Sequence, residues 1–493
     1  MLGGRRLGTV PTYAVVAAAA VGCVVLRLPF VHGVPYTDEG GLLVVARQWH
    51  AHGPYLYGDL FVDRPPLLLL FFRAAADLGG IVPLRFLGLV LVALTVVAAG
   101  VAGHLLGGRR GATCAALVTA ALLADPRLGT REVDAETVGI PFVVLAATLA
   151  QSAVRLTPGR RRRLLLLGAG AAGTCAVLVK QNLAGGLVFA LVLVAATGME
   201  GRAGRRTAGE VGVVLAGAAV PLAAAVGWCG VAATGPGGLW YSAYGFRLAS
   251  SSSLFDETSG TQMARLHELL WAALWSGLSV LVLVSVAQLL RRGRPDPVAL
   301  ALLAMLVVEV VGVAGGGYYW THYLIGLVPA TALLTARAAG AATRPVLLGG
   351  LVAATLLSSV VETAQVATDL TPADRTQVGA LTGWFERVQQ PGDSALVLYG
   401  EASLFETTRL RPAYPYLWTL PQRVLDPHLT LLVRTLDGSP GPRFVVVRSD
   451  LDSWGLDPGG RVDRALALHY RVAAHVADDT IYLRRGTVSQ NAP

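Results

Sequence analysis

Apolar runs long enough to cross a membrane recur through the first three quarters of this 493-residue chain. A spanning helix needs roughly 20 mainly apolar residues, and such runs follow one another from residue 12 to residue 361. Only 14% of the residues are charged and the mean hydropathy is +0.57, whereas a soluble domain carries about 25% charged residues. We therefore expect an α-helical polytopic membrane protein.

We predict eleven transmembrane helices from these runs. They cover residues 12–31, 82–106, 111–125, 137–154, 164–179, 183–198, 209–233, 264–289, 298–314, 323–338 and 345–361. The first run follows Arg5 and Arg6, as a signal peptide would, but it lacks a small-residue cleavage site and is interpreted as a retained helix. The apolar segment 65–80 is too short to span and is predicted to be interfacial or re-entrant.

Charged residues between the spans sort onto two sides. If the N-terminus is cytoplasmic, the arginine-rich turns all fall inside, at 107–110, 155–163, 201–206, 291–294 and 337–344. The opposite loops then hold the acidic, histidine and aromatic residues, as the positive-inside bias requires. The net charge of +9 is therefore a signal of topology and not of nucleic-acid binding. We expect a multi-pass protein of a bacterial-type plasma membrane.

The tail, residues 362–493, has the composition of a soluble domain. Short strand-like runs at 394–399, 443–447 and 480–484 alternate with amphipathic stretches at 375–389 and 461–472, which predicts a small α/β domain. An odd number of spans places it outside the cytoplasm. All four cysteines lie in apolar runs, so this domain is expected to fold without disulfides. The predicted division is a transmembrane domain, 1–361, followed by this domain.

The first outer loop, residues 32–64, carries the adjacent acids Asp38 and Glu39. A carboxylate at the point where a helix leaves the bilayer stays beside water while it faces a lipid-borne ligand, so it can act as a general base. The alternative is structural, because Asp38 can also cap the helix that follows. The two roles are compatible.

Three features of this loop resemble a known family. They are Asp38-Glu39, a Gly-Pro-Tyr-Leu-Tyr-Gly-Asp turn at 53–59, and Arg64-Pro-Pro-Leu. Together they are similar to the first loop of GT-C superfamily membrane glycosyltransferases, especially glycosyltransferase family 39 with the protein O-mannosyltransferases, and the lipid A aminoarabinose transferase group. The resemblance implies a polyprenyl-phosphate sugar donor, Asp38 as the base and Glu39 as its neighbour in the active site. Arg64 stands where the family often has lysine.

A second outer loop reads Arg131-Glu132-Val-Asp134-Ala-Glu136 and resembles the second acidic motif of the same superfamily. The structural alternative is that Asp134 and Glu136 cap the next helix. Three acids also suit Mg²⁺, Mn²⁺ or Ca²⁺. Because the O-mannosyltransferase-like members need no metal, we expect no cofactor and leave a divalent cation as the alternative.

Two further motifs lie at the outer lip. Lys180, the only lysine of the chain, and Gln181 interrupt an apolar run, where the resemblance implies binding of the donor phosphate and the alternative is a lysine snorkelling to the interface. His322 follows the aromatic stretch 318–320. It is a candidate ligand for the donor, while the aromatic residues fit an interfacial belt. Arg64 and Arg131 complete the predicted phosphate site.

The predicted function is transfer of a hexose or pentose from a polyprenyl-phosphate donor to an acceptor hydroxyl on the outer face, with inversion. The acceptor, whether protein, lipid or polysaccharide, is left open, and the loop around 240–247 is either an acceptor groove or a plain loop. A nucleotide-binding fingerprint is absent from the sequence. The alternatives are a secondary transporter or flippase, for which Glu309 inside a span is the relevant acid, and a non-catalytic scaffold.

Overall fold

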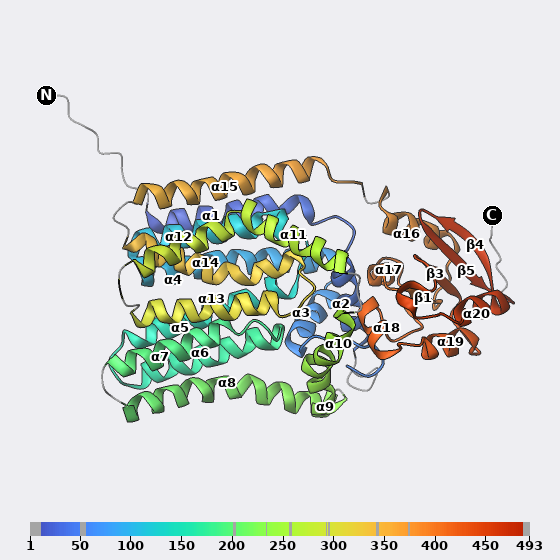
Figure 1. The fold of residues 1–493 in the computed structure, drawn as a ribbon, viewed down its shortest axis with the longest axis horizontal. Helices are drawn as coiled ribbons and strands as arrows, with labels where there is room; N and C mark the ends of the chain where they lie inside the picture. The colour runs from blue at the N-terminus through green and yellow to red at the C-terminus, as the bar shows by residue number, and fades with distance from the viewer. Residues whose placement is uncertain are drawn as a thin grey trace.

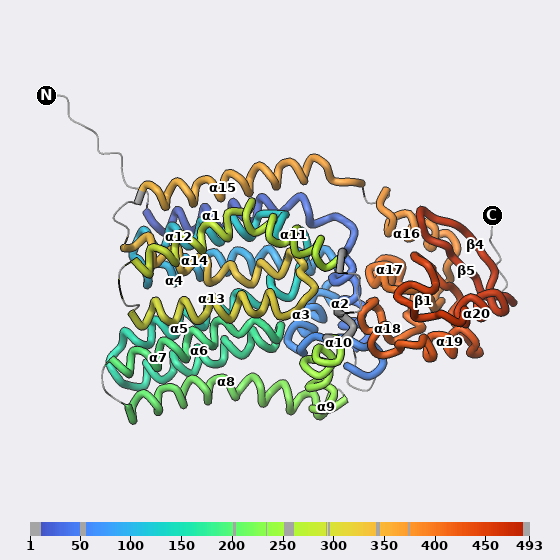
Figure 2. Tube along the Cα trace, viewed as in Figure 1, coloured from blue at the N-terminus to red at the C-terminus, as the bar shows by residue number. Residues whose placement is uncertain are grey.

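The computed structural model describes residues 11–49, 56–200, 204–232, 234–255, 259–291, 293, 296–341, 345–372 and 375–486. It has two parts, a bundle of long helices that run side by side and a smaller α/β domain at one end of it (Figure 1). The chain enters the bundle at the end far from this domain, and the tube view follows its path (Figure 2). Residues 53–55 of the turn in the first loop lie outside the described residues.

The bundle consists of helices along a common direction (Figure 1). They are α1 (Thr12–Arg27), α4 (Ile81–Ala124), α5 (Ala135–Val154), α6 (Arg160–Val179), α7 (Gly185–Glu200), α8 (Gly204–Ala232), α11 (Ser259–Trp275), α12 (Leu278–Leu290), α13 (Pro297–Ala314), η4 (Thr321–Leu327), α14 (Val328–Gly340) and α15 (Pro345–Thr368). Among the described residues, 8 helices meet the length and hydropathy of a span, or 9 if α11 and α12, bent by 63°, count as one.

Helix α4 is a helical hairpin. Its backbone leaves helical geometry at Gly107 and Gly108, and Gly108 has φ +59°, a conformation that glycine adopts without strain. A Cβ on Gly103 would lie 2.6 Å from the Cβ of Ala115, although residues so spaced lie about 18 Å apart in a straight helix. The chain therefore reverses here. With two spans in α4 and a shorter one in α7, the described residues agree with the predicted eleven.

Short helices fill the space between the bundle and the small domain (Figure 1). They are α2 (Thr37–Gln48), α3 (Pro66–Asp77), α9 (Gly235–Trp240), the π-helical turn η3 (Tyr241–Gly245) and α10 (Phe246–Phe255), with single turns at η1 (Leu28–Phe30) and η2 (Pro126–Leu128). Helix α3 is the segment predicted to be interfacial. Its 12 residues are too few to cross a bilayer.

The small domain is built on a five-stranded mixed sheet of order β2-β1-β3-β5-β4. Its elements are β1 (Ser394–Leu398), β2 (Arg411–Pro412), β3 (Phe444–Val447), β4 (Tyr470–Val476) and β5 (Asp479–Arg484), with α16 (Gln377–Val388), α17 (Ala402–Thr408), α18 (Thr419–Leu425), α19 (Thr430–Asp437), η6 (Ser453–Gly455) and α20 (Arg461–His469). Strand β1 pairs in parallel with β2 and β3, and β5 is antiparallel to β3 and β4.

One predicted boundary in this domain is wrong. The amphipathic stretch 461–472 was expected to be helical throughout, but α20 ends at His469 and Tyr470 begins β4. Strand β4 pairs with β5 from Tyr470↔Arg484 onward, so the sheet hydrogen bonds override the local helical pattern.

The ends of the bundle differ in charge. At the end away from the small domain, Arg109 and Arg110 line a cavity of about 790 Å³ together with His104 and the starts of α1 and α15. The acidic loops lie at the other end, beside the small domain. This arrangement matches the predicted sorting of the turns, of which 201–203, 292, 294 and 342–344 lie outside the described residues.

The hairpin in α4 is tested by replacing Gly103 with leucine. The side chain would meet Gly111 and Ala115, so we expect a loss of roughly 1–3 kcal/mol of unfolding free energy from overpacking, seen as a lower Tm in detergent. The control is Gly212→Leu on α8, where an added Cβ meets nothing within 4 Å. Equal Tm values for both variants would contradict the reversal.

Candidate active site

The two adjacent acids of α2 have different surroundings. Both lie in the first turn of the helix, where the free amides and the helix dipole favour carboxylates. Successive residues of a helix project about 100° apart, so one acid faces inward and the other outward. Glu39 is fully buried, whereas the Asp38 side chain is 34% exposed and lines a cavity.

Glu39 connects several segments of the chain through its hydrogen bonds. It accepts hydrogen bonds from the backbone N–H of Tyr36 at 3.2 Å and of Val133 at 3.0 Å, and from Arg85 at 2.6 and 3.1 Å. Tyr36 is the N-cap residue and Glu39 closes the capping box, so the cap predicted for Asp38 is made by its neighbour. Glu39 does not line the cavity, and the geometry assigns it to holding the loop.

The cavity has a volume of about 480 Å³ and lies between the bundle and the small domain. Its wall on the bundle side includes Asp38, Asp63, Arg64, Glu132, Arg247 and His322, and its wall on the other side includes Trp418, Arg423 and Trp454. Side chains separated by hundreds of residues therefore line one cavity.

Asp38 is held from both walls. Its Oδ1 accepts a hydrogen bond of 2.9 Å from the indole N–H of Trp418, and its Oδ2 lies 3.7 Å from the guanidinium of Arg64. Arg64 also pairs with Asp63 at 2.6 Å, and Asp63 pairs with Arg247. The result is a row of alternating charges along the cavity.

This row of charges sets the ionisation of its members. Burial raises the pKa of Asp63, but Arg247 and Arg64 outweigh it and lower that pKa below its ordinary value. Burial lowers the pKa of Arg64, but Asp63 and Asp38 outweigh it and raise that pKa. Both groups are therefore charged at neutral pH, and Arg64 presents a fixed positive charge beside Asp38.

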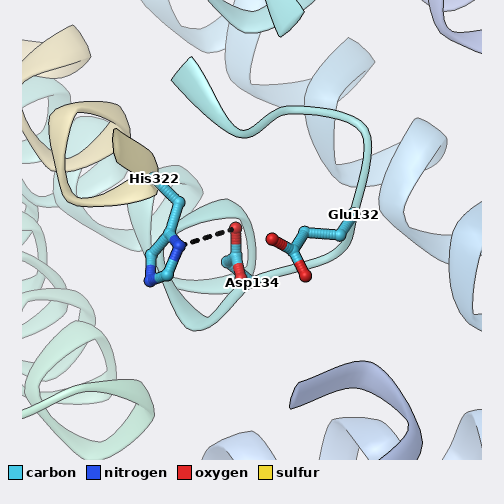
Figure 3. Close-up of side chains that lie close together, drawn as sticks. All are labelled: Glu132, Asp134 and His322. Atoms are coloured by element: carbon cyan, nitrogen blue, oxygen red, sulfur yellow. Dashed lines mark ion pairs between the residues drawn. The ribbon is translucent and has the colours of Figure 1, made fainter. Parts of the chain in front are cut away.

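The second acidic loop meets the aromatic motif at the cavity. Ligand atoms of Glu132, Asp134 and His322 lie within 4.8 Å of one another, and His322 Nδ1 is 4.0 Å from Asp134 Oδ2 (Figure 3). That oxygen is buried without a hydrogen-bond partner. Asp134 is the N-cap residue of α5, but its side chain accepts no capping bond, so the capping alternative is wrong for it.

These carboxyl groups resist ionisation. Burial raises the pKa of Glu132 and of Asp134 well above their ordinary values, and the neighbouring carboxylates raise them further. Two carboxylates and an imidazole form a donor set that fits a divalent cation such as Mn²⁺ or Zn²⁺, which would replace the protons. These three residues could hold one.

Lys180 lies behind the cavity wall. It is buried, forms an ion pair with Glu136 on the first turn of α5, and lies 4.3 Å from the ring centroid of Tyr323. Burial lowers its pKa below the ordinary value for lysine, although Glu136 opposes the shift. Neither Lys180 nor Gln181 lines the cavity, so a direct contact of either with a phosphate there is not part of this geometry.

Arg131 flanks the cavity. Its guanidinium stacks on Tyr36 at 5.6 Å from the ring centroid, and Tyr36 lines the space. Of the residues predicted for the site, the structure thus brings Asp38, Arg64, Glu132 and His322 to one cavity, and the others do not line it.

Sequence reasoning missed several lining residues. Arg247 lies in the region 240–247, which was expected to be either an acceptor groove or a plain loop. In the structure Arg247 is part of helix α10, and its side chain forms an ion pair with Asp63. Trp418, Arg423 and Trp454 belong to the small domain, and their sequence carries no signal that points to the bundle.

Comparison with solved structures shows what this architecture is similar to. ArnT from Cupriavidus metallidurans in the apo state has a TM-score of 0.63 and 14% identity, covering 95% of this chain and 97% of its own. The same protein bound to undecaprenyl phosphate gives 0.61 and 15%, covering 97% and 99%. Oligosaccharyltransferase AglB from Archaeoglobus fulgidus, in complex with an inhibitory peptide and a dolichol-phosphate, gives 0.53 and 12%, covering 97% and 75%.

In comparisons of sequence, no family model and no curated protein matches the chain. Both neighbours have the GT-C fold, so this chain is a multi-pass membrane protein with that fold. Its likeness to ArnT confirms, at the level of the fold, the predicted resemblance to the lipid A aminoarabinose transferase group.

Replacing Glu39 with glutamine tests its structural assignment. Arg85 would be left buried without its counter-charge, and we expect a loss of roughly 3–5 kcal/mol, measured as a lower Tm and less folded protein in the membrane. Asp38→Asn serves as the control, because Asp38 is partly exposed and has no buried arginine as its sole counter-charge, so it should lower the Tm much less. A stable Glu39→Gln protein that lacks activity would instead restore Glu39 as a catalytic residue.

Cation binding at Glu132, Asp134 and His322 is tested by thermal unfolding with Mn²⁺ or Zn²⁺ at several pH values. Both carboxyl groups must lose protons to bind, and their pKa values are raised, so stabilisation should be absent at low pH and grow as the pH rises. Asp134→Asn should remove it. An unchanged Tm at every pH would exclude a cation here.

Proposed function

We propose that this protein is an inverting glycosyltransferase that moves a sugar from a polyprenyl-phosphate donor to an acceptor hydroxyl on the outer face of the membrane. One observation carries the proposal: Asp38, next to the fixed charge of Arg64, lines a cavity between the bundle and the small domain. The structures of ArnT with undecaprenyl phosphate and of AglB with a dolichol-phosphate support this class of donor.

The proposed orientation follows from the charges at the two ends of the bundle. Arginine-rich turns favour the cytoplasm, and the cavity lies at the opposite end with the small domain. The N-terminus is then cytoplasmic, and the small domain and the cavity are extracytoplasmic. A lipid-anchored donor would reach the cavity from the outer leaflet.

In the proposed reaction, Asp38 takes the proton of the acceptor hydroxyl. The hydroxyl oxygen forms a bond to the anomeric carbon while the bond from that carbon to the phosphate oxygen breaks, so the configuration inverts and the polyprenyl phosphate leaves. Arg64, and His322 as a hydrogen-bond donor, would stabilise the negative charge on the leaving phosphate. Arg131, Lys180 and Glu136 do not line the cavity, and in this proposal they support the side chains that do.

The side chains alone suffice for this proposal. A divalent cation held by Glu132, Asp134 and His322 would add positive charge near the leaving phosphate. The chemistry assigned to Asp38 and Arg64 is the same with or without it.

The proposal is tested with Asp38→Asn and a panel of radiolabelled undecaprenyl-phosphate hexoses and pentoses. Asparagine keeps the size of the side chain but cannot accept the proton, so release of label from the lipid should fall at least about a hundredfold. The control is Asp77→Asn on α3, whose side chain is 59% exposed.

Normal turnover by the Asp38→Asn protein would remove Asp38 as the base. Proteoliposomes that show substrate flux without sugar transfer would favour the transporter or flippase alternative. Glu309, buried on α13 with both carboxyl oxygens unbonded, is the residue on which that alternative depends.

A further inference from the structure

A tryptophan of the small domain contacts the acid proposed as the base. Trp418 lies 380 residues beyond Asp38 and donates its indole N–H to Oδ1 at 2.9 Å. It is the N-cap residue of α18 and lines the same cavity. The bond occupies one carboxylate oxygen and leaves Oδ2, the oxygen near Arg64, for other partners.

The glycine pair after the acids makes room for this contact. A Cβ on Gly41 would overlap the Trp418 ring and lie 2.7 Å from the Cβ of Ala402, and one on Gly40 would lie 2.9 Å from the Cβ of Ser403. Glycine inside a helix costs up to about 1 kcal/mol relative to alanine. The Asp-Glu-Gly-Gly sequence therefore fits a helix whose first turns are covered at close range by the small domain.

A second contact joins the residue before Asp38 to the small domain. Thr37 donates its hydroxyl to Glu401 at 2.8 Å. Glu401 is ion-paired with Arg448, and Arg448 bonds Asp479 at 3.1 Å. Glu401 follows β1 and Arg448 follows β3, so the anchor belongs to the sheet itself. The small domain thus contacts α2 at the residue before the acid as well as at the acid itself.

We propose that Trp418 is a positioning residue for Asp38, and that the small domain is therefore part of the catalytic machinery. The inference rests on the proposed function, in which Asp38 is the base. The indole N–H fixes the rotation of the carboxylate so that Oδ2 faces the cavity.

The first test is Trp418→Phe, assayed with the undecaprenyl-phosphate sugar of the panel that the wild-type protein uses. Loss of a hydrogen bond to a charged group should lower kcat about tenfold to a hundredfold, with the KM for the donor nearly unchanged. The control is Trp384→Phe, in the same domain but packed on Phe385 and Phe444.

The second variant, Gly41→Ala, keeps the indole but displaces its ring, and should reproduce the loss in kcat with the KM for the donor nearly unchanged. Its control is Gly22→Ala on α1, where an added Cβ meets nothing within 4 Å. Tm and monodispersity in detergent establish that each protein is folded. Agreement between the two variants separates an effect on Asp38 from a folding defect of either one.

Asp38→Asn in the same assay separates this inference from the proposed function. If that variant turns over normally, the base assignment fails and the inference fails with it. If it is inactive while Trp418→Phe and Gly41→Ala keep the wild-type kcat, the inference alone is overturned. A rise in KM with an unchanged kcat would also overturn it, because Trp418 would then bind the donor.

Discussion

The buried pair of Glu39 and Arg85 is the interaction on which the arrangement of this site depends. Arg85, on α4, bonds Glu39 and also the backbone carbonyls of Phe30, Gly33 and Val34, while Glu39 bonds the N–H of Val133. One ion pair therefore joins η1 and the loop after it, the start of α2, α4 and the second acidic loop. Because separating a buried ion pair is strongly destabilising, these four segments keep a fixed geometry.

That geometry gives two adjacent acids opposite roles. With Glu39 turned into the bundle, Asp38 is turned toward the cavity and the small domain. The second acidic loop is pinned by Val133, which places Glu132 and Asp134 beside His322. The candidate site is thus assembled from loops, but Glu39 and Val133 tie those loops to the long helix α4 through Arg85.

Hydropathy and charge were enough to predict the bundle. Local composition predicts the helix breaks, the reversal at Gly107–Gly108 and the sorting of arginines. Short motifs at the predicted outer ends of the spans identify four residues of the cavity: Asp38, Arg64, Glu132 and His322. Local pattern could not show which of two neighbouring acids is buried, because that depends on Arg85, 46 residues away.

The small domain was harder to predict for the same reason. Strand β4 begins inside an amphipathic stretch because its partner, β5, lies beyond it in the chain. The bond from Trp418 to Asp38 joins residues with no shared pattern. Gly40 and Gly41 were the only local sign of a close neighbour, and their meaning becomes clear only when Ser403 and Trp418 are placed against them.

The central claim is that the phosphate of a lipid-linked donor binds beside Asp38. A structure of the protein with undecaprenyl phosphate tests it most directly. The account predicts the phosphate in the cavity under the small domain, within reach of the Arg64 guanidinium and facing the Asp38 carboxylate. A phosphate in the cavity at the opposite end of the bundle, beside His104, Arg109 and Arg110, would contradict it.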